Sequence, residues 1–344
     1  MGRLSHKKLL KAEKHLLELA EIPTETTRIY LDHQDNYSIF CLQCGDPGKP
    51  PMIMVHGYMG SSVMFYRILK GLCQEYRLYC LDLLGMGRSS RPCFMMENRE
   101  ECEDFFVYPI EVCRDRLGIE KFVLAGHSFG GYVSGCYAEK YPNRVEKLVL
   151  ISPIGIPRHP IGWTFQGWME SQSWKDRFVM RLVCLFWGKK MSGATILRNA
   201  GPFSGKIIEM YLGGRISGIS EKEMNSVYTY LEQVNLYPGS GEYSLDQILD
   251  QGLYALSPLC DRLINVPIVY LYGDRDWILP DGAEQNSKFN SCPIITEIIS
   301  NSGHHMYLDN PHELVTKILR SVKELDNMHK LNQKQLENQA NPMQ

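Results

Sequence analysis

A serine between two glycines stands where a short apolar run gives way to a helical pattern. Residues 126–130 read GHSFG, directly after the apolar run 122–125 and before the helical stretch that begins at residue 131. In a G-x-S-x-G turn of this kind the serine is held in a strained conformation, and the glycines let strand and helix approach closely. Ser128 is therefore predicted to be a nucleophile, and His127 beside it to be structural.

A serine hydroxyl attacks a carbonyl efficiently only when a histidine removes its proton, and that histidine needs a carboxylate to orient it. His304 follows Gly303 on a loop beyond the apolar run 294–299, so His304 is predicted to be the base. Its neighbour His305 is the alternative base and is otherwise expected to face solvent.

Two carboxylates follow another apolar run, residues 268–272. This run ends in Gly273, and Asp274 and Asp276 come directly after it, at the tip of a late strand. The G-x-x-D spacing favours Asp276 as the acid that orients His304, and the order serine, acid, histidine is known for such triads. Asp274 stays the alternative acid and is otherwise a turn residue.

The negative charge that develops on the attacked carbonyl oxygen needs hydrogen-bond donors. Residues 56–58 close the apolar run 52–55, at the place where a loop with such donors is expected. The backbone N–H groups of Tyr58 and Phe129 are predicted to form this oxyanion hole, and His56 to support the loop.

The β-rich runs that would position these residues alternate with helical stretches along the chain. The first two β-rich runs indicate an antiparallel lead-in, whereas the later runs are continuously apolar, as strands covered on both faces must be. Helical stretches at residues 100–117 and 131–141 separate them, which predicts a mostly parallel α/β sheet flanked by helices. The predicted strands are residues 28–32, 37–44, 52–56, 77–83, 122–125, 147–152, 267–272 and 294–299.

The α/β pattern breaks between residues 156 and 263, which predicts a helical cap inserted late in the sheet. The hydrolytic core would then comprise residues 23–155 and 264–322. Aromatic side chains recur in the cap, and they indicate either core packing or an apolar pocket under a lipid-facing lid. These aromatic residues are Trp163, Phe165, Trp168, Trp174, Phe178, Phe186 and Trp187.

Two terminal segments have patterns of their own. Residues 1–22 predict an amphipathic helix, because leucines recur at helical spacing among lysines; such a helix packs on a core or lies on a membrane surface. Residues 323–344 are poor in apolar residues and rich in Asn, Gln and Lys, so they are predicted to be a disordered tail.

Composition excludes several classes of function. A net charge of −2 provides no basic field for nucleic acid, and 44% apolar residues fit a folded protein of 344 residues. The eleven scattered cysteines predict reduced thiols in a cytoplasmic compartment. The lone pair Cys41-x-x-Cys44 lacks a second pair, so neither a metal site nor any cofactor is predicted.

With Ser128, Asp276 and His304 in place, the chain resembles the α/β-hydrolase fold family. Further segments at residues 122–160, 240–243 and 255–259, with H-x-x-x-x-D from His304 to Asp309, resemble one branch of it. That branch contains the lipid-droplet lipase co-activator, the N-acyl-phosphatidylethanolamine lysophospholipase and the mitochondrial cardiolipin deacylase. The similarity covers roughly residues 28 to 320, the size of one capped domain.

The resemblance implies hydrolysis of acyl esters in phospholipids or lysophospholipids through an acyl-enzyme. In this family H-x-x-x-x-D, and with it Asp309, is proposed for acyl transfer to lysophosphatidate, which is one alternative function. Others are a soluble ester, amide or peptide as substrate, and a lipase-regulating droplet protein without activity. The co-activator lacks the serine that this chain has at Ser128, which favours an enzyme. Transient contact with a membrane or lipid droplet is expected, with a mitochondrial location left open and protein partners unknown.

Overall fold

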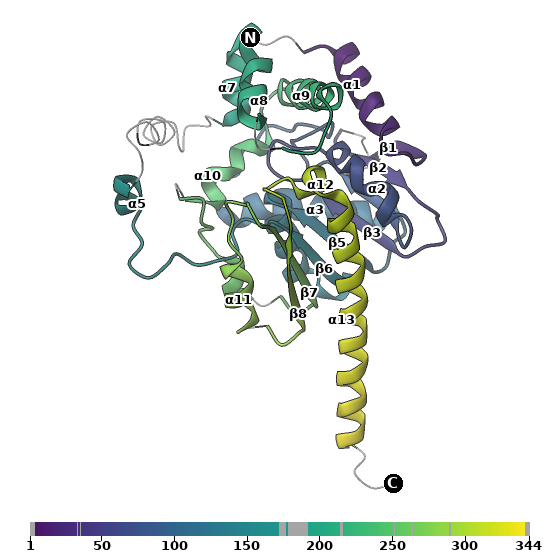
Figure 1. Cartoon of the computed structure of the whole chain (residues 1–344). Coiled ribbons are helices and arrows are strands. Elements are labelled where there is room, and N and C mark those ends of the chain that lie inside the picture. The colour runs from purple at the N-terminus through teal and green to yellow at the C-terminus, as the bar shows by residue number, and fades with distance from the viewer. Residues whose placement is uncertain are drawn as a thin grey trace.

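A central β-sheet organises the computed structural model, which describes residues 4–32, 34, 36–171, 177, 192–213, 216–250, 252–262, 264–288 and 290–340. Within these ranges, eight strands form one sheet in the order β1-β2-β4-β3-β5-β6-β7-β8 (Figure 1). The strands are β1 (Thr24–Tyr30), β2 (Ser38–Cys44), β3 (Pro51–Val55), β4 (Arg77–Leu81), β5 (Phe122–His127), β6 (Val145–Ile151), β7 (Ile268–Gly273) and β8 (Ile294–Ile299).

The direction of the strands follows the pattern expected from the sequence. β1 pairs antiparallel with β2, and β2 pairs antiparallel with β4, whereas the pairs from β4 to β8 are parallel. Every residue of β5 and of β7 is buried, because helices cover both faces of the parallel part. The predicted α/β fold, with its antiparallel lead-in, is confirmed.

Helices cover the two faces of the sheet (Figure 1). Met52 and Met54 of β3 join the core under α2 (Tyr66–Leu72) and α13 (Pro311–Ala340). The alternate residues Ile53 and Val55 point to the opposite face, and join the core under α3 (Arg99–Arg116), α4 (Phe129–Lys140) and α11 (Asp281–Ser287). The strands therefore lie between two hydrophobic cores.

The chain between β6 and β7 is helical where the structure describes it. It forms α5 (Phe165–Ser171), α7 (Gly193–Asn199), α8 (Ser204–Leu212), α9 (Glu221–Asn235) and α10 (Leu245–Ile248). Figure 1 shows α7, α8 and α9 grouped together on one side of the sheet; we call these three the cap helices. Trp163 stacks on His159, with 4.4 Å between ring centroids. Trp174, Phe178, Phe186 and Trp187 lie outside the described residues, as does the side chain of Trp168, and the cap bounds 156–263 stay a prediction.

Short elements complete the fold. α12 (Met306–Asp309) follows the predicted base, and five 3-10 helices occur in the described ranges. These are η1 (Ser62–Phe65), η2 (Pro142–Arg144), η3 (Gly201–Phe203), η4 (Gly241–Ser244) and η5 (Leu259–Asp261). No helix within the described ranges is long and apolar enough to cross a membrane.

The N-terminal helix α1 (His6–Glu18) lies beside α9 (Figure 1). Its leucines Leu9 and Leu16 are buried, and the N–H of Ser5 donates to Gln233 Oε1 on α9 at 2.7 Å. Glu13 forms an ion pair with Arg88 at 2.5 Å. The helix therefore packs on the protein, which is the first of the two alternatives for it.

The structure differs from the predicted disordered tail of residues 323–344 over residues 323–340, which belong to α13. α13 continues to Ala340, and Figure 1 shows its C-terminal part projecting away from the sheet. Leu325 is fully buried, and Asp326 forms an ion pair with Lys147 of β6 at 2.6 Å. A few well-placed contacts at the start of this polar stretch thus hold it in the helix, although its composition is poor in apolar residues.

Candidate active site

Ser128 occupies a tight turn between β5 and α4. Its φ of 54° and ψ of −118° lie outside the usual regions for a residue with a Cβ atom, which is the strain expected of the turn. A Cβ on Gly126 would lie 2.3 Å from the carbonyl oxygen of Gly130, and one on Gly130 would lie 2.3 Å from that of His56. Only glycine fits at both positions, so the sequence pattern follows from the close approach of α4 to the strands.

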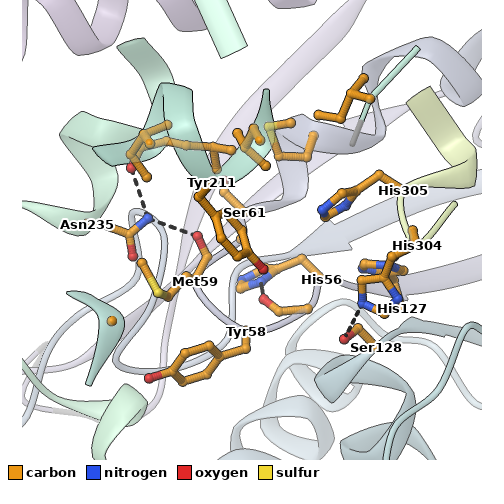
Figure 2. Close-up of a pocket in the computed structure, with 18 of the residues that line it drawn as sticks. His56, Tyr58, Met59, Ser61, His127, Ser128, Tyr211, Asn235, His304 and His305 are labelled. Carbon is orange, nitrogen blue, oxygen red and sulfur yellow. Dashed lines mark hydrogen bonds between the residues drawn. The ribbon is translucent and has the colours of Figure 1, made fainter. Parts of the chain in front are cut away.

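The structure brings the three predicted triad residues into one line of contacts. His304 Nε2 lies 2.9 Å from Ser128 Oγ, as the dashed line in Figure 2 marks, and His304 Nδ1 lies 3.2 Å from Asp276 Oδ1. Ser128 comes from the β5–α4 turn, Asp276 from the loop after β7 and His304 from the loop after β8. These loops meet because the carboxyl ends of parallel strands lie at the same edge of a sheet.

Asp276 is held as a carboxylate. Burial alone would raise its pKa, but hydrogen bonds from His304, from Ser152 and from the N–H of Ile278 hold the pKa of Asp276 below its ordinary value. The N–H of Ile278 donates to Asp276 Oδ1 at 3.1 Å. A negative charge beside Nδ1 favours the tautomer in which Nδ1 carries the proton and Nε2 is left to accept one from Ser128.

Ser152 belongs to the site and was missed in the sequence. Its hydroxyl donates to Asp276 Oδ2 and lies 2.9 Å from His304 Nδ1, so the Nδ1 proton is shared between the carboxylate and this hydroxyl. Ser152 directly follows β6 and has a φ of 46°. A serine after an apolar run has no distinctive spacing; only its place at the same sheet edge could have suggested it.

The alternative acid Asp274 and the alternative base His305 make other contacts. Asp274 accepts the N–H groups of Asn301 and Ser302, each at 2.9 Å, and these hydrogen bonds lower its pKa, with Ser302 contributing most. It thus shapes the loop that leads to His304 without contacting that side chain. The expectation that His305 faces solvent is wrong, because His305 lines the cavity described below and its Nδ1 lies 2.9 Å from Tyr307 Oη.

Two other histidines support the loops. His127 donates its Nε2–H to the carbonyl oxygen of His304 at 2.9 Å, and burial, with His304 and His305 nearby, keeps its pKa well below the ordinary value. His56 donates its Nδ1–H to the Gly57 carbonyl at 2.7 Å and accepts the N–H of Leu83 at 3.0 Å. Both histidines thus bond backbone groups of the loops around the site, and their structural role stays a prediction.

The predicted oxyanion loop lies against the turn at Ser128. A Cβ on Gly57 would lie 3.0 Å from that of Ser128. In the described part of the chain, the backbone N–H groups of Tyr58 and Phe129 donate to no other residue. Asp82 anchors the far end of the loop by accepting the N–H of Ser62 at 2.5 Å. The oxyanion hole formed by Tyr58 and Phe129 stays a prediction.

An apolar cavity of about 390 Å³ opens beside Ser128 and His304 (Figure 2). Its volume lies in the range of ligand pockets. The cap helices supply much of the wall, and Figure 2 shows Tyr211 projecting from α8 into the cavity. The aliphatic residues in the wall are Ile154, Ile196, Leu197, Ile207, Ile208, Leu212, Ile216, Leu231, Leu245, Leu249, Leu253 and Leu308.

No cluster of three or more His, Cys, Asp or Glu side chains suited to a metal occurs among the residues that the structure describes. Cys41 and Cys44 lie in different hydrophobic cores, on opposite faces of the sheet. They therefore cannot bind one ion together, because residues three apart on a strand point to opposite sides.

Several known proteins are similar to this chain in sequence. Residues 50–311 match the alpha/beta hydrolase fold family. A probable 1-acylglycerol-3-phosphate O-acyltransferase of Oryza sativa subsp. japonica is 31% identical over 277 residues, 77% of this chain and 65% of that protein. The chain thus spans less than two thirds of that relative's length. The (lyso)-N-acylphosphatidylethanolamine lipase of Homo sapiens is 29% identical over 272 residues, covering 77% of this chain and 76% of the lipase.

The solved structures agree on the fold. The carboxylesterase CesB of Bacillus subtilis superposes with a TM-score of 0.64 at 21% sequence identity, over 91% of this chain and 96% of the esterase. The resemblance drawn from the sequence, including its branch with the N-acyl-phosphatidylethanolamine lipase, is confirmed. This chain therefore belongs to the alpha/beta hydrolase fold family.

Proposed function

We propose that this protein is a serine hydrolase that cleaves an acyl ester of a phospholipid or lysophospholipid. The observation that carries the proposal is the line of contacts from Ser128 through His304 to Asp276 at the edge of an apolar cavity. A hydroxyl, an imidazole and a carboxylate in this arrangement are what acyl transfer to serine requires.

The hydrogen bonds between Ser128, His304 and Asp276 indicate the steps of the proposed reaction. Ser128 Oγ attacks the ester carbonyl while its proton passes to His304 Nε2, and the N–H groups of Tyr58 and Phe129 stabilise the oxyanion. His304 then protonates the leaving alcohol, which leaves an acyl group on Ser128. A water molecule attacks this acyl-enzyme, His304 takes the water proton and returns it to Ser128, and the fatty acid is released.

The cavity supports a long apolar acyl group as the part of the substrate that is bound. Each methylene moved from water into such a wall contributes roughly 0.8 kcal/mol. The side chains of Tyr211 and Trp277 line the cavity and are both 54% exposed. Exposed aromatic and aliphatic side chains around a mouth suit contact with a lipid surface.

Acyl transfer is the second candidate, because the rice relative is a probable acyltransferase of 1-acylglycerol-3-phosphate. The same acyl-enzyme would serve both reactions: the hydroxyl of a lysophospholipid would replace water as the attacking group. The human relative is a lipase of (lyso)-N-acylphosphatidylethanolamine, which supports water as the acceptor. Water and the hydroxyl of a lysophospholipid could both enter through the exposed mouth of the cavity.

A fluorophosphonate probe, which reacts only with an activated serine, tests the mechanism. We expect wild type to be labelled, Ser128→Ala and His304→Ala not to be labelled, and Asp276→Asn to be labelled about 10³ to 10⁴ times more slowly, because the amide favours the wrong tautomer of the histidine. Asp274→Asn is the matched control, and its labelling rate should stay within about tenfold of wild type.

The substrate is tested with vesicles of phosphatidylcholine, phosphatidylethanolamine and their lyso forms, with a soluble short-chain ester alongside, each with and without acyl-CoA. Fatty acid released from vesicles supports the proposal. Cleavage of the soluble ester alone would point to an esterase of small substrates, and a new phospholipid that forms only with acyl-CoA to an acyltransferase. A folded protein that reacts with none of these, including the probe, would leave a non-catalytic lipid-binding role.

A further inference from the structure

Asp309, the last residue of the H-x-x-x-x-D motif, connects the loop of the proposed base to the cap. Asp309 Oδ2 accepts the N–H of Gly303, next to His304, at 2.9 Å. Asp309 Oδ1 accepts the N–H of Ser217 at 2.7 Å and the hydroxyl of Ser217 at 3.2 Å. One carboxylate thus holds both the catalytic loop and the chain between α8 and α9.

Arg67 on α2 holds the same two segments from the other side. Its Nη1 donates to the carbonyl oxygen of Leu308 at 2.6 Å, and its Nη2 donates to that of Gly218 at 3.2 Å. Arg67 Nε forms an ion pair with Glu223 of α9 at 3.2 Å, and the hydroxyl of Tyr66 donates to the same carboxylate oxygen at 2.5 Å. A core helix therefore fixes both α12 and the start of α9.

These contacts lie directly behind the wall of the cavity. Ile216 and Leu308, the chain neighbours of Ser217 and Asp309, are both buried and both line the cavity. A shift of the segment 216–220 away from α12 would therefore open that wall. Because Asp309 and Arg67 bond with full charges to backbone groups, these hydrogen bonds are stronger than neutral ones.

We infer that Asp309 and Arg67 form a latch that seats the cap segment 216–220 against the loop of His304. They are positioning residues, because they touch neither the Ser128 hydroxyl nor the His304 ring. They act by keeping the wall of the apolar cavity in place beside the reacting groups. The acidic residue of H-x-x-x-x-D then serves to close the cavity and takes no part in acyl transfer. The effect on catalysis rests on the proposed hydrolase function, whereas the latch itself does not.

Hydrogen exchange of backbone amides tests the latch without any need for activity. In Asp309→Ala and in Arg67→Ala, we expect amides of segment 216–220 to exchange roughly tenfold faster than in wild type, because their acceptor or their anchor is lost. Asp309→Asn keeps one acceptor oxygen and should give a smaller increase. Asp104→Ala, which removes an exposed carboxylate on α3 that pairs with Lys140 of α4, is the matched control and should leave this segment unchanged.

Kinetics then test the consequence. For a long-chain phospholipid, kcat/KM of Asp309→Ala should fall about tenfold, mainly through a higher KM, while fluorophosphonate labelling of Ser128 changes less than about threefold. Arg67→Ala should behave in the same way, and Arg67→Lys should restore part of the loss.

Unchanged exchange at 216–220 in both alanine variants would overturn the latch. Loss of only an acyl-CoA-dependent product in Asp309→Ala, with hydrolysis and exchange unchanged, would assign Asp309 to acyl transfer instead. If wild type neither labels nor hydrolyses, the proposed function fails, and the exchange data still decide the latch.

Discussion

The hydroxyl of Ser152 shares with the carboxylate of Asp276 the task of orienting His304. It donates to Asp276 Oδ2 and lies 2.9 Å from His304 Nδ1, nearer than the 3.2 Å between Nδ1 and Asp276 Oδ1. The imidazole is thus oriented by a carboxylate and a hydroxyl together. In the proposed reaction, the charge that forms on His304 as Ser128 attacks would be stabilised by a carboxylate that this hydroxyl keeps in place.

At the scale of single residues, Ser152→Ala should slow fluorophosphonate labelling of Ser128 about tenfold. The variant loses one hydrogen bond to a charged group, worth roughly 1.5 kcal/mol, while two other donors to Asp276 remain. The labelling rate constant at saturating probe measures this. Ser287→Ala, which removes a hydroxyl bonded to the carbonyl of Glu284 on α11, is the control. An unchanged rate in Ser152→Ala would show that Asp276 orients His304 alone.

Much of this site could be predicted because its residues stand at the ends of apolar runs. Ser128, Asp276 and His304 each follow a strand, and glycines mark the turn at Ser128 and the loops at Gly273 and Gly303. Ser152 also follows a strand, but serine is common in turns, and its partners lie 124 and 152 positions further along the chain. Contacts of that separation leave no local pattern.

At the scale of elements, α13 shows how burial of a few side chains outweighs composition. Its first turns pack on the core that α2 shares, through Leu314, Ile318, Val322 and Leu325 at helical spacing. The composition changes after residue 322, but Leu325 still lies on the buried face of the helix. A helix that is already anchored propagates at little cost, so it continues into a polar stretch.

Leu325→Ala should lower the free energy of unfolding by about 3 kcal/mol, since it removes a fully buried leucine and leaves a cavity. Met328→Ala, one turn further on at a residue that is 36% exposed, should cost less than about 1 kcal/mol. Urea unfolding followed by tryptophan fluorescence measures both. Equal, small losses in the two variants would mean that the ordered chain ends before Leu325, as the composition had suggested.

At the scale of the whole molecule, the sheet could be predicted and the cavity could not. Alternation of apolar runs with helical stretches is a local signal, and it gave the strands within a few residues. The cavity wall combines residues near Tyr58, Ser128 and His304 with the cap helices, which have no α/β pattern. That these parts of the wall meet beside Ser128 depends on packing between segments far apart in the chain.

One buried ionic cluster connects three parts of the fold outside the site. Arg262, just before β7, donates through Nη1 and Nη2 to the two carboxylate oxygens of Glu103 on α3, at 2.9 and 3.0 Å. Its Nε donates to Glu139 on α4 at 2.7 Å, and the hydroxyl of Tyr132 donates to Glu103 at 2.7 Å. The cluster thus fixes α3 and α4 against the chain that enters β7.

Glu103 makes the stability of the protein depend on pH in a definite direction. Burial would raise its pKa, but hydrogen bonds from Arg262 and Tyr132 outweigh burial and hold the pKa of Glu103 below its ordinary 4.5. A lowered pKa in the folded state adds stability that is complete above pH 4.5 and is lost as the pH falls through the folded value. Acid should therefore weaken the cluster only below the ordinary range for a glutamate.

Glu103→Gln should lower the free energy of unfolding by roughly 3 kcal/mol near neutral pH, because the buried guanidinium of Arg262 keeps only Glu139 as a charged partner. Urea unfolding at about pH 7, 5 and 3.5 should show the same loss at the two higher values and a smaller one at the lowest, where the wild-type carboxylate also begins to be protonated. Asp104→Asn, at an exposed pair with Lys140, should change stability by less than about 1 kcal/mol throughout. A difference between wild type and Glu103→Gln that grows toward acid pH would mean that Glu103 is protonated in the fold, and that α3 is held by packing alone.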